Sequence, residues 1–281
     1  MRAVVLDDAG QPSVADVPAP DGPGELIRLR ACGLCGSDVE KLGRAAAGTV
    51  LGHEVVGELE NGLRVVLGHH RPCGECRRCR AGHESACAEF AAATIRPGGF
   101  AEQIRADFYV ELSDGVDDLE GTFAEPLACV LRGAERLPHG RILVVGYGSV
   151  GRLFGAVLRR RGDTVFAVDV RPERAGVPPD GPVDAAVLCG PAGASDALAT
   201  VEPGGRVLVF ASAGGVDLDP VYRRELEVVG SRGTTPRHLR EAVQLLEELD
   251  LPEPTAVPLE RFRDGLELYR SGKALKIVYT P

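Results

Sequence analysis

The sequence is poor in several residue types that mark particular classes of protein. It contains no tryptophan, one methionine and only three lysines, and its 41 acidic residues outnumber its 32 basic ones. Because nucleic-acid binding needs clustered positive charge, the formal net charge of −9 argues against DNA or RNA as a partner. No apolar run is long enough to cross a bilayer, so we expect no membrane contact.

The first ten residues, MRAVVLDDAG, lack the apolar core of a secretory signal. We therefore expect a cytoplasmic protein. With 281 residues and a 44% hydrophobic composition, the chain has room for one large or two ordinary domains. In a reducing cytoplasm, patterned cysteines bind metal or perform chemistry more often than they form disulfides, which draws attention to the eight cysteines.

Four cysteines are clustered with the spacing C-x2-C-x2-C-x7-C, namely Cys73, Cys76, Cys79 and Cys87. Four thiolates complete the tetrahedral coordination of zinc and leave no open position, which is typical of a structural site. The alternative is a set of unliganded or redox-active thiols. Since this set needs no further ligand, we interpret the preceding His69 and His70 as turn or surface residues.

A second set of metal-binding residue types is dispersed along the chain. Cys35 lies in ACGLCGSD, His53 and Glu54 lie in LGHE, and Glu125 lies in FAEPLAC. A catalytic zinc needs about three mixed protein ligands and one exchangeable position. The spacing alone leaves alternatives open, because a histidine is often a hydrogen-bonded structural residue and Cys32 with Cys35 can form a redox pair. We expect Cys32, Cys129 and Cys189 to be buried packing residues.

A glycine-rich segment predicts a dinucleotide site. A short apolar strand ends in the sequence GYGSVG, in which Gly146 permits a tight turn, Gly148 lets the backbone approach a pyrophosphate, and Gly151 allows close helix packing. Ser149 and Val150 open the following helix, whose free N–H groups favour phosphate. Asp169, 18 residues beyond Gly151, is placed to bind ribose hydroxyls and predicts NAD rather than NADP. Arg171 is a further candidate, which softens that preference.

The connection after Asp169 is unusually short. Residues 170–182, VRPERAGVPPDGP, are rich in proline and cannot supply a helix, a strand and a second helix. We therefore predict a doubly wound parallel sheet that lacks its third strand. In the usual strand order of a doubly wound dinucleotide-binding sheet, 3-2-1-4-5-6, the third strand lies at the edge. Its loss therefore leaves the other strands contiguous.

Taken in order, the motifs GLCGSD, LGHE, the four-cysteine segment, GGFAE, EPLA and GYGSVG resemble the zinc-dependent medium-chain dehydrogenase/reductase superfamily. The resemblance covers essentially the whole chain and is strongest to the polyol, sorbitol and threonine dehydrogenase branch. It implies an α/β protein with two domains. A GroES-like, partly open β-barrel catalytic domain would comprise residues 1–126 and 233–281, and a Rossmann domain residues 127–232. The chain is short for this architecture.

The resemblance also implies roles for individual residues. Cys35 and His53 would be zinc ligands, Glu54 a ligand or an exchangeable neighbour, and Glu125 would lie at or near the metal. Asp38 would hydrogen-bond the ring of His53 and fix its tautomer. Ser37 would start a proton relay, and Glu40 stands where many members carry a histidine as the outer end of that relay. For Glu40, an exposed helix charge is an equal interpretation.

The activity implied is hydride transfer between a secondary alcohol, of polyol, sugar or cyclitol type, and NAD. The enzyme would carry one catalytic and one structural zinc, bind a small alcohol or ketone, and form a homodimer or homotetramer. Three alternatives remain: a zinc-free reductase of the same superfamily, a simple alcohol dehydrogenase, and a non-catalytic protein that binds NAD and zinc.

Overall fold

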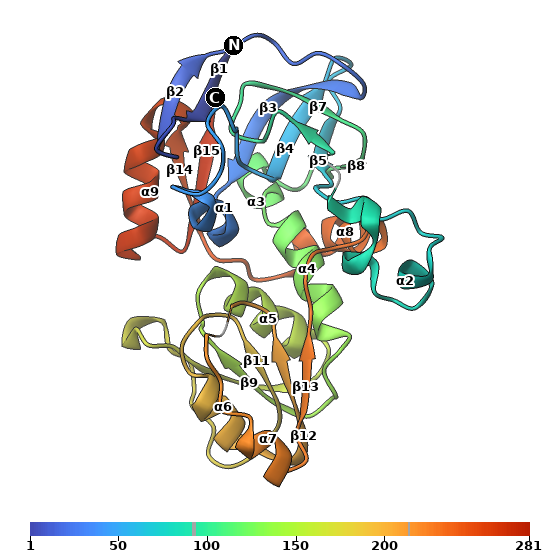
Figure 1. Ribbon diagram of the computed structural model, residues 1–281, viewed down its shortest axis with the longest axis vertical. Coiled ribbons are helices and arrows are strands. Elements are labelled where there is room, and N and C mark those ends of the chain that lie inside the picture. The colour runs from blue at the N-terminus through green and yellow to red at the C-terminus, as the bar shows by residue number, and fades with distance from the viewer. Residues whose placement is uncertain (92–93, 213) are drawn as a thin grey trace. The chain divides into compact units, whose positions relative to one another are not determined.

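The computed structural model describes residues 1–91, 94–212 and 214–281, and the chain divides into two compact units (Figure 1). The first unit comprises Met1–Ala128, Thr234–Glu248 and Glu253–Pro281. The second comprises Cys129–Gly233 and Leu249–Pro252. The first unit is therefore assembled from both ends of the chain.

The first unit is built on an eight-stranded sheet that is antiparallel except for one pair of strands. Its main path runs β14-β15-β3-β4-β5-β8, and β7 pairs with both β3 and β6. The bounds are β3 (Glu25–Gly33), β4 (Glu54–Leu59), β5 (Arg64–Leu67), β6 (Ile95–Arg96), β7 (Gln103–Ala106), β8 (Tyr109–Glu111), β14 (Pro254–Pro258) and β15 (Lys276–Thr280). A two-stranded sheet of β1 (Arg2–Leu6) and β2 (Pro12–Asp16) completes the predicted barrel.

Strand β3 closes this barrel because it has different partners along its length. Its first half pairs with both β4 and β7, and its last residues pair with β4 and β15. A register shift between Leu29 and Ala31 bends the strand between these two halves. The end of β3 therefore lies beside both the start of β4 and the C-terminal strand.

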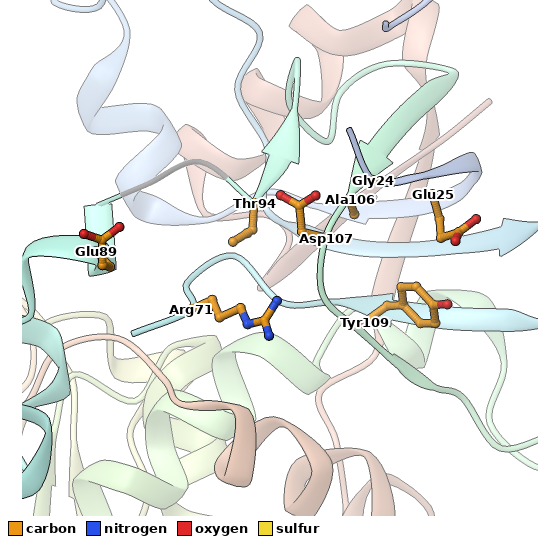
Figure 2. Close-up of a pocket in the computed structure, with 8 residues that line it drawn as sticks. All are labelled: Gly24, Glu25, Arg71, Glu89, Thr94, Ala106, Asp107 and Tyr109. Atoms are coloured by element: carbon orange, nitrogen blue, oxygen red, sulfur yellow. The ribbon is translucent and has the colours of Figure 1, made fainter. Parts of the chain in front are cut away.

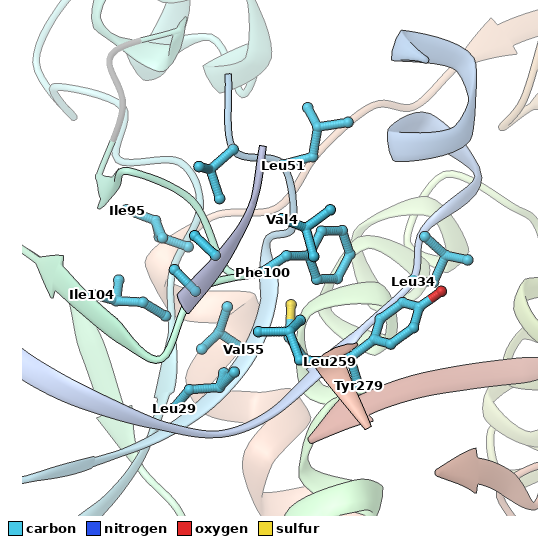
Figure 3. Close-up of a cluster of buried hydrophobic side chains, with 14 of the residues drawn as sticks. Val4, Leu29, Leu34, Leu51, Val55, Ile95, Phe100, Ile104, Leu259 and Tyr279 are labelled. Atoms are coloured by element: carbon cyan, nitrogen blue, oxygen red, sulfur yellow. The ribbon is translucent and has the colours of Figure 1, made fainter. Parts of the chain in front are cut away.

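The barrel core is mostly aliphatic, and aromatic rings, among them Phe100 and Tyr279, pack within it (Figure 3). The ring of Phe100 lies 5.0 Å from Phe262 and 5.3 Å from Tyr279, and the last two rings stack at 4.4 Å. The Tyr279 hydroxyl donates a hydrogen bond of 2.9 Å to the Phe262 carbonyl, so its polar end is satisfied. A Cβ at Gly265 would lie 2.6 Å from that hydroxyl oxygen, which explains why helix and strand approach so closely there.

The helices of the first unit are in the connections between its strands. They are α1 (Gly36–Lys41), α2 (Arg77–Arg80), α3 (Asp118–Gly121), α8 (Pro236–Leu245) and α9 (Phe262–Ser271), while α4 (Ala124–Ala134) runs across the boundary between the units. The amphipathic α8 buries His238, Leu239, Ala242 and Val243. None of the described helices is long and apolar enough to cross a membrane.

The second unit is a parallel five-stranded sheet in the order β10-β9-β11-β12-β13. The strands are β9 (Arg141–Val145), β10 (Thr164–Val168), β11 (Val183–Leu188), β12 (Val201–Val209) and β13 (Glu227–Gly230), with helices α5 (Ser149–Arg160), α6 (Ala194–Thr200) and α7 (Asp219–Arg223). The predicted α/β class and Rossmann sheet are confirmed. Strands β9 and β11 lie inside the sheet, and their valine, leucine and alanine side chains are buried accordingly.

The predicted loss of the third strand is also confirmed. Strand β10 is the edge of the sheet, and within the described residues no further strand pairs with it. Instead, a short 3-10 turn (Pro172–Arg174) leads into a segment that follows the open edge. The Ala167 amide donates to the Val177 carbonyl at 2.9 Å, and the Gly176 amide donates to the Ala167 carbonyl at 3.2 Å. The proline-rich connection thus covers part of the edge that the missing strand would have paired.

Candidate metal and cofactor sites

Cys35 is positioned by the turn between β3 and α1. It has an extended backbone at the start of α1, and its amide donates a hydrogen bond of 3.2 Å to Asp38 Oδ2. The turn is narrow, because a Cβ added at Gly33 would collide with the side chains of Glu54 and Lys276. A side chain at position 33 would therefore displace Glu54.

Cys35, His53 and Glu54 form what we call the mixed cluster. One ligand atom from each lies within 4.8 Å of the others. Glu54 lies near Cys35 because it pairs with Gly33 across strands β3 and β4. His53 comes close to both because it directly precedes Glu54 in the chain. One sulfur, one nitrogen and one oxygen donor leave a fourth tetrahedral position open, so the donor set fits a catalytic zinc.

Asp38 orients the imidazole of His53. Its Oδ1 lies 3.2 Å from His53 Nδ1 and accepts a 3.2 Å hydrogen bond from the Gly52 amide. Burial disfavours the charged forms, but the Asp38 carboxylate outweighs it and holds the pKa of His53 well above its ordinary value. Burial also opposes ionisation of Asp38, but the charge of His53 and its hydrogen bond outweigh it and lower the pKa of the Asp38 carboxyl. The expected contact is therefore present, and it leaves Nε2 of His53 for a metal.

Lys276 in β15 is part of this region, and the sequence interpretation missed it. Its ammonium group forms an ion pair with the Glu54 carboxylate, and both side chains are 3% exposed. The Lys276 nitrogen also lies 5.0 Å from the centre of the Phe123 ring. The signal in the sequence was a single lysine within the otherwise apolar run ALKIVYT, whose charge needs a buried partner.

The structure places the remaining predicted residues at different depths. Ser37 is exposed, and its hydroxyl lies 3.3 Å from Cys35 Sγ. Glu40 is exposed near the end of α1. Glu125 is buried at the start of α4, but it is not among the described residues that form the mixed cluster.

His69 contacts the mixed cluster although it was interpreted as a turn or surface residue. It lies in a bend after β5, as expected, but its ring is half-buried and its centre is 4.8 Å from that of His53. Burial, together with the charge of His53, lowers the pKa of His69 to about 2. His69 is therefore a neutral group beside a predicted metal ligand.

Cys73, Cys76, Cys79 and Cys87 form what we call the sulfur cluster, in a loop that also carries α2 (Figure 1). The Sγ atoms of Cys76 and Cys79 are 3.5 Å apart, those of Cys73 and Cys87 are 3.6 Å apart, and those of Cys73 and Cys79 are 3.9 Å apart. A zinc tetrathiolate has sulfur–sulfur edges of about 3.8 Å, so this cluster fits zinc closely.

Backbone amides support the sulfur cluster. The Cys73 amide donates to Cys87 Sγ at 3.5 Å and lowers the pKa of that thiol. The Cys76 and Cys79 amides donate to the sulfur atoms of Cys73 and Cys76, respectively. All eight cysteines are free thiols, and of the three expected as packing residues only Cys32 is fully buried. Cys129 is half-buried, so the expectation was wrong for it. Cys189 is also partly exposed as a residue, but burial of its thiol raises the pKa, in line with the expectation.

The glycine-rich turn of the second unit has the expected shape. Gly146 has a φ of 88°, which favours glycine, and a Cβ at Gly151 would collide with the Gly146 carbonyl. Helix α5 then starts at Ser149 and Val150. Asp169 accepts hydrogen bonds from the Tyr147 amide at 2.7 Å and the Arg171 amide at 2.9 Å. The carboxylate is thereby fixed beside the turn.

Arg174 is a second residue that the sequence interpretation missed. Its Nη1 lies 4.0 Å from the position that a Cβ on Gly148 would occupy. A guanidinium at this distance from a helix N-terminus adds positive charge where a pyrophosphate would bind. The only signal was its place in the connection after Asp169.

A hollow of about 540 Å³ lies elsewhere on the first unit (Figure 2). Arg71, Glu89, Asp107 and Tyr109 are among its lining residues. None of the lining residues belongs to the two cysteine-containing clusters. We assign no role in the reaction to this hollow.

Comparisons with known proteins identify the family. Residues 22–113 match the GroES-like domain of alcohol dehydrogenases. D-altritol 5-dehydrogenase of Agrobacterium fabrum is 30% identical over 301 positions, which cover 88% of each chain. This chain belongs to the polyol branch of the medium-chain dehydrogenase/reductase superfamily. The predicted family is thereby confirmed.

More distant members of the superfamily match over the full length. Sorbitol dehydrogenase of Bombyx mori is 26% identical over 98% of this chain and 97% of its own. The solved structure of alcohol dehydrogenase TADH from Thermus sp. ATN1 superposes with a TM-score of 0.84 at 26% identity and covers both chains completely. This dehydrogenase thus has both parts of the family's architecture, the GroES-like domain and the Rossmann sheet, and its described residues form no third strand in that sheet.

Proposed function

We propose that this protein catalyses reversible hydride transfer between a secondary alcohol group of a polyol or sugar-type substrate and NAD, with a catalytic zinc. The observation that carries this proposal is the mixed cluster, in which three donors of different kinds lie within 4.8 Å of one another. A relative that acts on a polyol, D-altritol 5-dehydrogenase, supports the substrate class.

Cys35, His53 and Glu54 would hold the zinc, which supplies Lewis acidity that lowers the pKa of an alcohol hydroxyl. Asp38 engages Nδ1 of His53, so Nε2 is the ring nitrogen that would bind the metal, with loss of its proton. Lys276 neutralises Glu54 and keeps its carboxylate in place. These two contacts pre-orient the donors, as the partners behind metal ligands do generally. Glu125 remains a proposed neighbour of the metal.

Ser37 is the proposed first proton acceptor from the substrate. Its hydroxyl lies beside Cys35 Sγ and is also exposed, so it connects the mixed cluster to solvent. Glu40, exposed three residues further along, is the proposed outer end of this relay. A carboxylate there serves as a general base in place of the imidazole common in the family.

The second unit is the proposed NAD-binding domain. Gly146, Gly148, Ser149, Val150 and Gly151 would bind the pyrophosphate through backbone N–H groups. Asp169 has lone pairs beyond those used by the Tyr147 and Arg171 amides, and these accept ribose hydroxyls. A carboxylate there repels a 2′-phosphate, so we propose NAD over NADP.

Further proposals concern the state of the protein. The sulfur cluster would hold a structural zinc. Residues 1–126 with 233–281 would form the catalytic domain, and residues 127–232 would form the cofactor domain. Free thiols throughout the chain fit a reducing compartment, so we propose a cytoplasmic location. We propose a homodimer or homotetramer, as is general in this superfamily.

One combined assay tests the proposed function. Zinc per chain is measured by mass spectrometry, and NAD or NADP reduction is followed at 340 nm with polyols, simple secondary alcohols and primary alcohols. We expect about two zinc ions per chain and NAD-linked turnover of polyols. A preference for primary alcohols would instead indicate a simple alcohol dehydrogenase. One zinc and no turnover with any alcohol would indicate a non-catalytic protein.

A further inference from the structure

His69 is a half-buried imidazole beside the mixed cluster, and one of its ring nitrogens is shielded from solvent. Its Nδ1 is buried and has no hydrogen-bond partner among the described residues. Buried polar atoms in native proteins are almost always paired, so an exception at a functional site needs an explanation. Nε2 of the same ring is not among the buried unpartnered atoms and forms no hydrogen bond with the described residues, so it is left for a ligand.

The ring of His69 packs against two other imidazole rings. Its centre lies 4.8 Å from that of His53, with the planes tilted by 31°. It lies 4.1 Å from that of His70, which in turn stacks on Phe90 at 4.0 Å. These four rings form a continuous ring stack, so His69 has little freedom to turn away from the mixed cluster.

The outer end of the ring stack is anchored. The His70 Nδ1 lies 2.8 Å from the Phe90 carbonyl oxygen, and Phe90 packs against Cys79 and Cys87 of the sulfur cluster. The sulfur cluster thus supports the imidazole that lies beside the mixed cluster. A rigidly held polar group next to a reaction site is the arrangement that produces substrate selectivity.

We propose that His69 is a specificity residue: its Nε2 hydrogen-bonds a second hydroxyl group of the substrate whose reacting hydroxyl is held at the mixed cluster. A polyol supplies this second hydroxyl, whereas a simple secondary alcohol does not. The proposal deepens the proposed function and rests on it. It explains why an imidazole, rather than an apolar ring, packs against His53.

The test compares two replacements at this position. His69→Phe keeps an aromatic ring in the ring stack but removes the nitrogen, and His69→Gln keeps a polar group near the place of Nε2. We expect His69→Phe to lower the ratio of kcat/KM for sorbitol to kcat/KM for 2-butanol by about 10- to 100-fold, the effect of one hydrogen bond. His69→Gln should recover most of that ratio. Tyr109→Phe, which removes the polar atom of a half-buried ring outside the ring stack and both clusters, is the control and should keep the ratio.

A binding measurement makes the test independent of turnover. Cobalt replaces zinc, and sorbitol is titrated while the visible absorption of the cobalt is recorded. His69→Phe should raise the apparent Kd for sorbitol by a similar factor, and His69→Gln should restore it. Equal losses for sorbitol and 2-butanol, or an unchanged Kd, would overturn the proposal.

The two proposals fail in different ways. If the proposed function is wrong, the unaltered protein shows no turnover with any alcohol and sorbitol does not change the cobalt absorption, which overturns both proposals. If only the role of His69 is wrong, the unaltered protein oxidises polyols and His69→Phe keeps its selectivity.

Discussion

The sulfur cluster and the mixed cluster lie in the same unit but are built in opposite ways. The sulfur cluster takes all four donors from 15 consecutive residues, Cys73 to Cys87, and backbone amides from the same loop support it. The mixed cluster takes its donors from two separate segments, and its Glu54 is held by Lys276, 222 residues away. A closed, local set of four thiolates suits a stabilising ion, whereas an open, mixed set suits chemistry.

The difference also appears in the surroundings. Charged groups support the mixed cluster from behind, namely Asp38 at His53 and Lys276 at Glu54. The sulfur cluster has a small apolar core of its own, formed by Cys79, Cys87 and Phe90. We therefore expect damage to the sulfur cluster to appear as lost stability and damage to the mixed cluster to appear as lost turnover.

The largest effect is expected for Cys76→Ala. Zinc binding at a structural site contributes directly to folding, so the variant should lose one zinc per chain and melt about 10 °C or more below the unaltered protein. Calorimetry and metal analysis measure both quantities. Arg77→Ala, an exposed neighbour, is the control. A variant that loses one zinc but melts normally would remove the structural role.

Cys35→Ala should do the reverse. Losing a ligand of the mixed cluster should reduce kcat/KM by about 1,000-fold or more, because several kcal/mol of transition-state stabilisation depend on the metal. The melting temperature should stay close to that of the matched variant Cys129→Ala. Retained turnover would show that the mixed cluster is not the reaction site.

Lys276→Met tests the buried ion pair. In metal-free protein, removing one partner leaves the Glu54 charge uncompensated, which should destabilise the protein by about 3–5 kcal/mol in urea unfolding. Adding Glu54→Gln should recover much of that loss, since no charge is then left buried. Lys273→Met, at an exposed lysine in the same region, should have no such effect. If the single and double variants are equally unstable, the pair does not act as a unit.

Asp38→Asn should weaken metal binding at the mixed cluster alone. Partners behind a ligating histidine typically change metal affinity by about 10- to 100-fold. In a chelator titration the variant should therefore release one zinc earlier and the other at an unchanged concentration. Asp21→Asn, at an exposed aspartate, provides the baseline. Simultaneous release of both ions would show that the two clusters are not independent.

Asp163→Asn should have the smallest effect, and it tests how one buried carboxylate in the second unit contributes to stability as the pH falls. Burial opposes ionisation of Asp163, but Arg161 and the Gly140 amide outweigh it and lower its pKa. Because the folded pKa is depressed, the carboxylate stabilises the protein fully above its ordinary pKa of 3.8, and this is lost as the pH falls through the folded value. We expect a loss of about 1–2 kcal/mol at pH 7 that vanishes in strong acid, measured by urea unfolding. A constant difference at all pH values would contradict this.

The sequence by itself determined what depends on short-range spacing. The cysteine spacing predicted a closed set of thiolates, because a few loop residues decide whether four sulfur atoms can meet. The spacing of Gly146, Gly148 and Gly151 predicted the glycine-rich turn, since each position favours glycine for a local steric reason. The short, proline-rich connection after Asp169 predicted the missing strand, because chain length limits which elements fit.

Only the tertiary structure decided which distant side chains support the mixed cluster. Lys276 reaches Glu54 because β15 pairs with β3, and His69 reaches His53 because β5 pairs with β4. No fixed separation along the sequence predicts either contact, since register across a sheet depends on the packing of the whole barrel. The local patterns therefore predicted the donors, and the closure of the barrel decided the charges and rings around them.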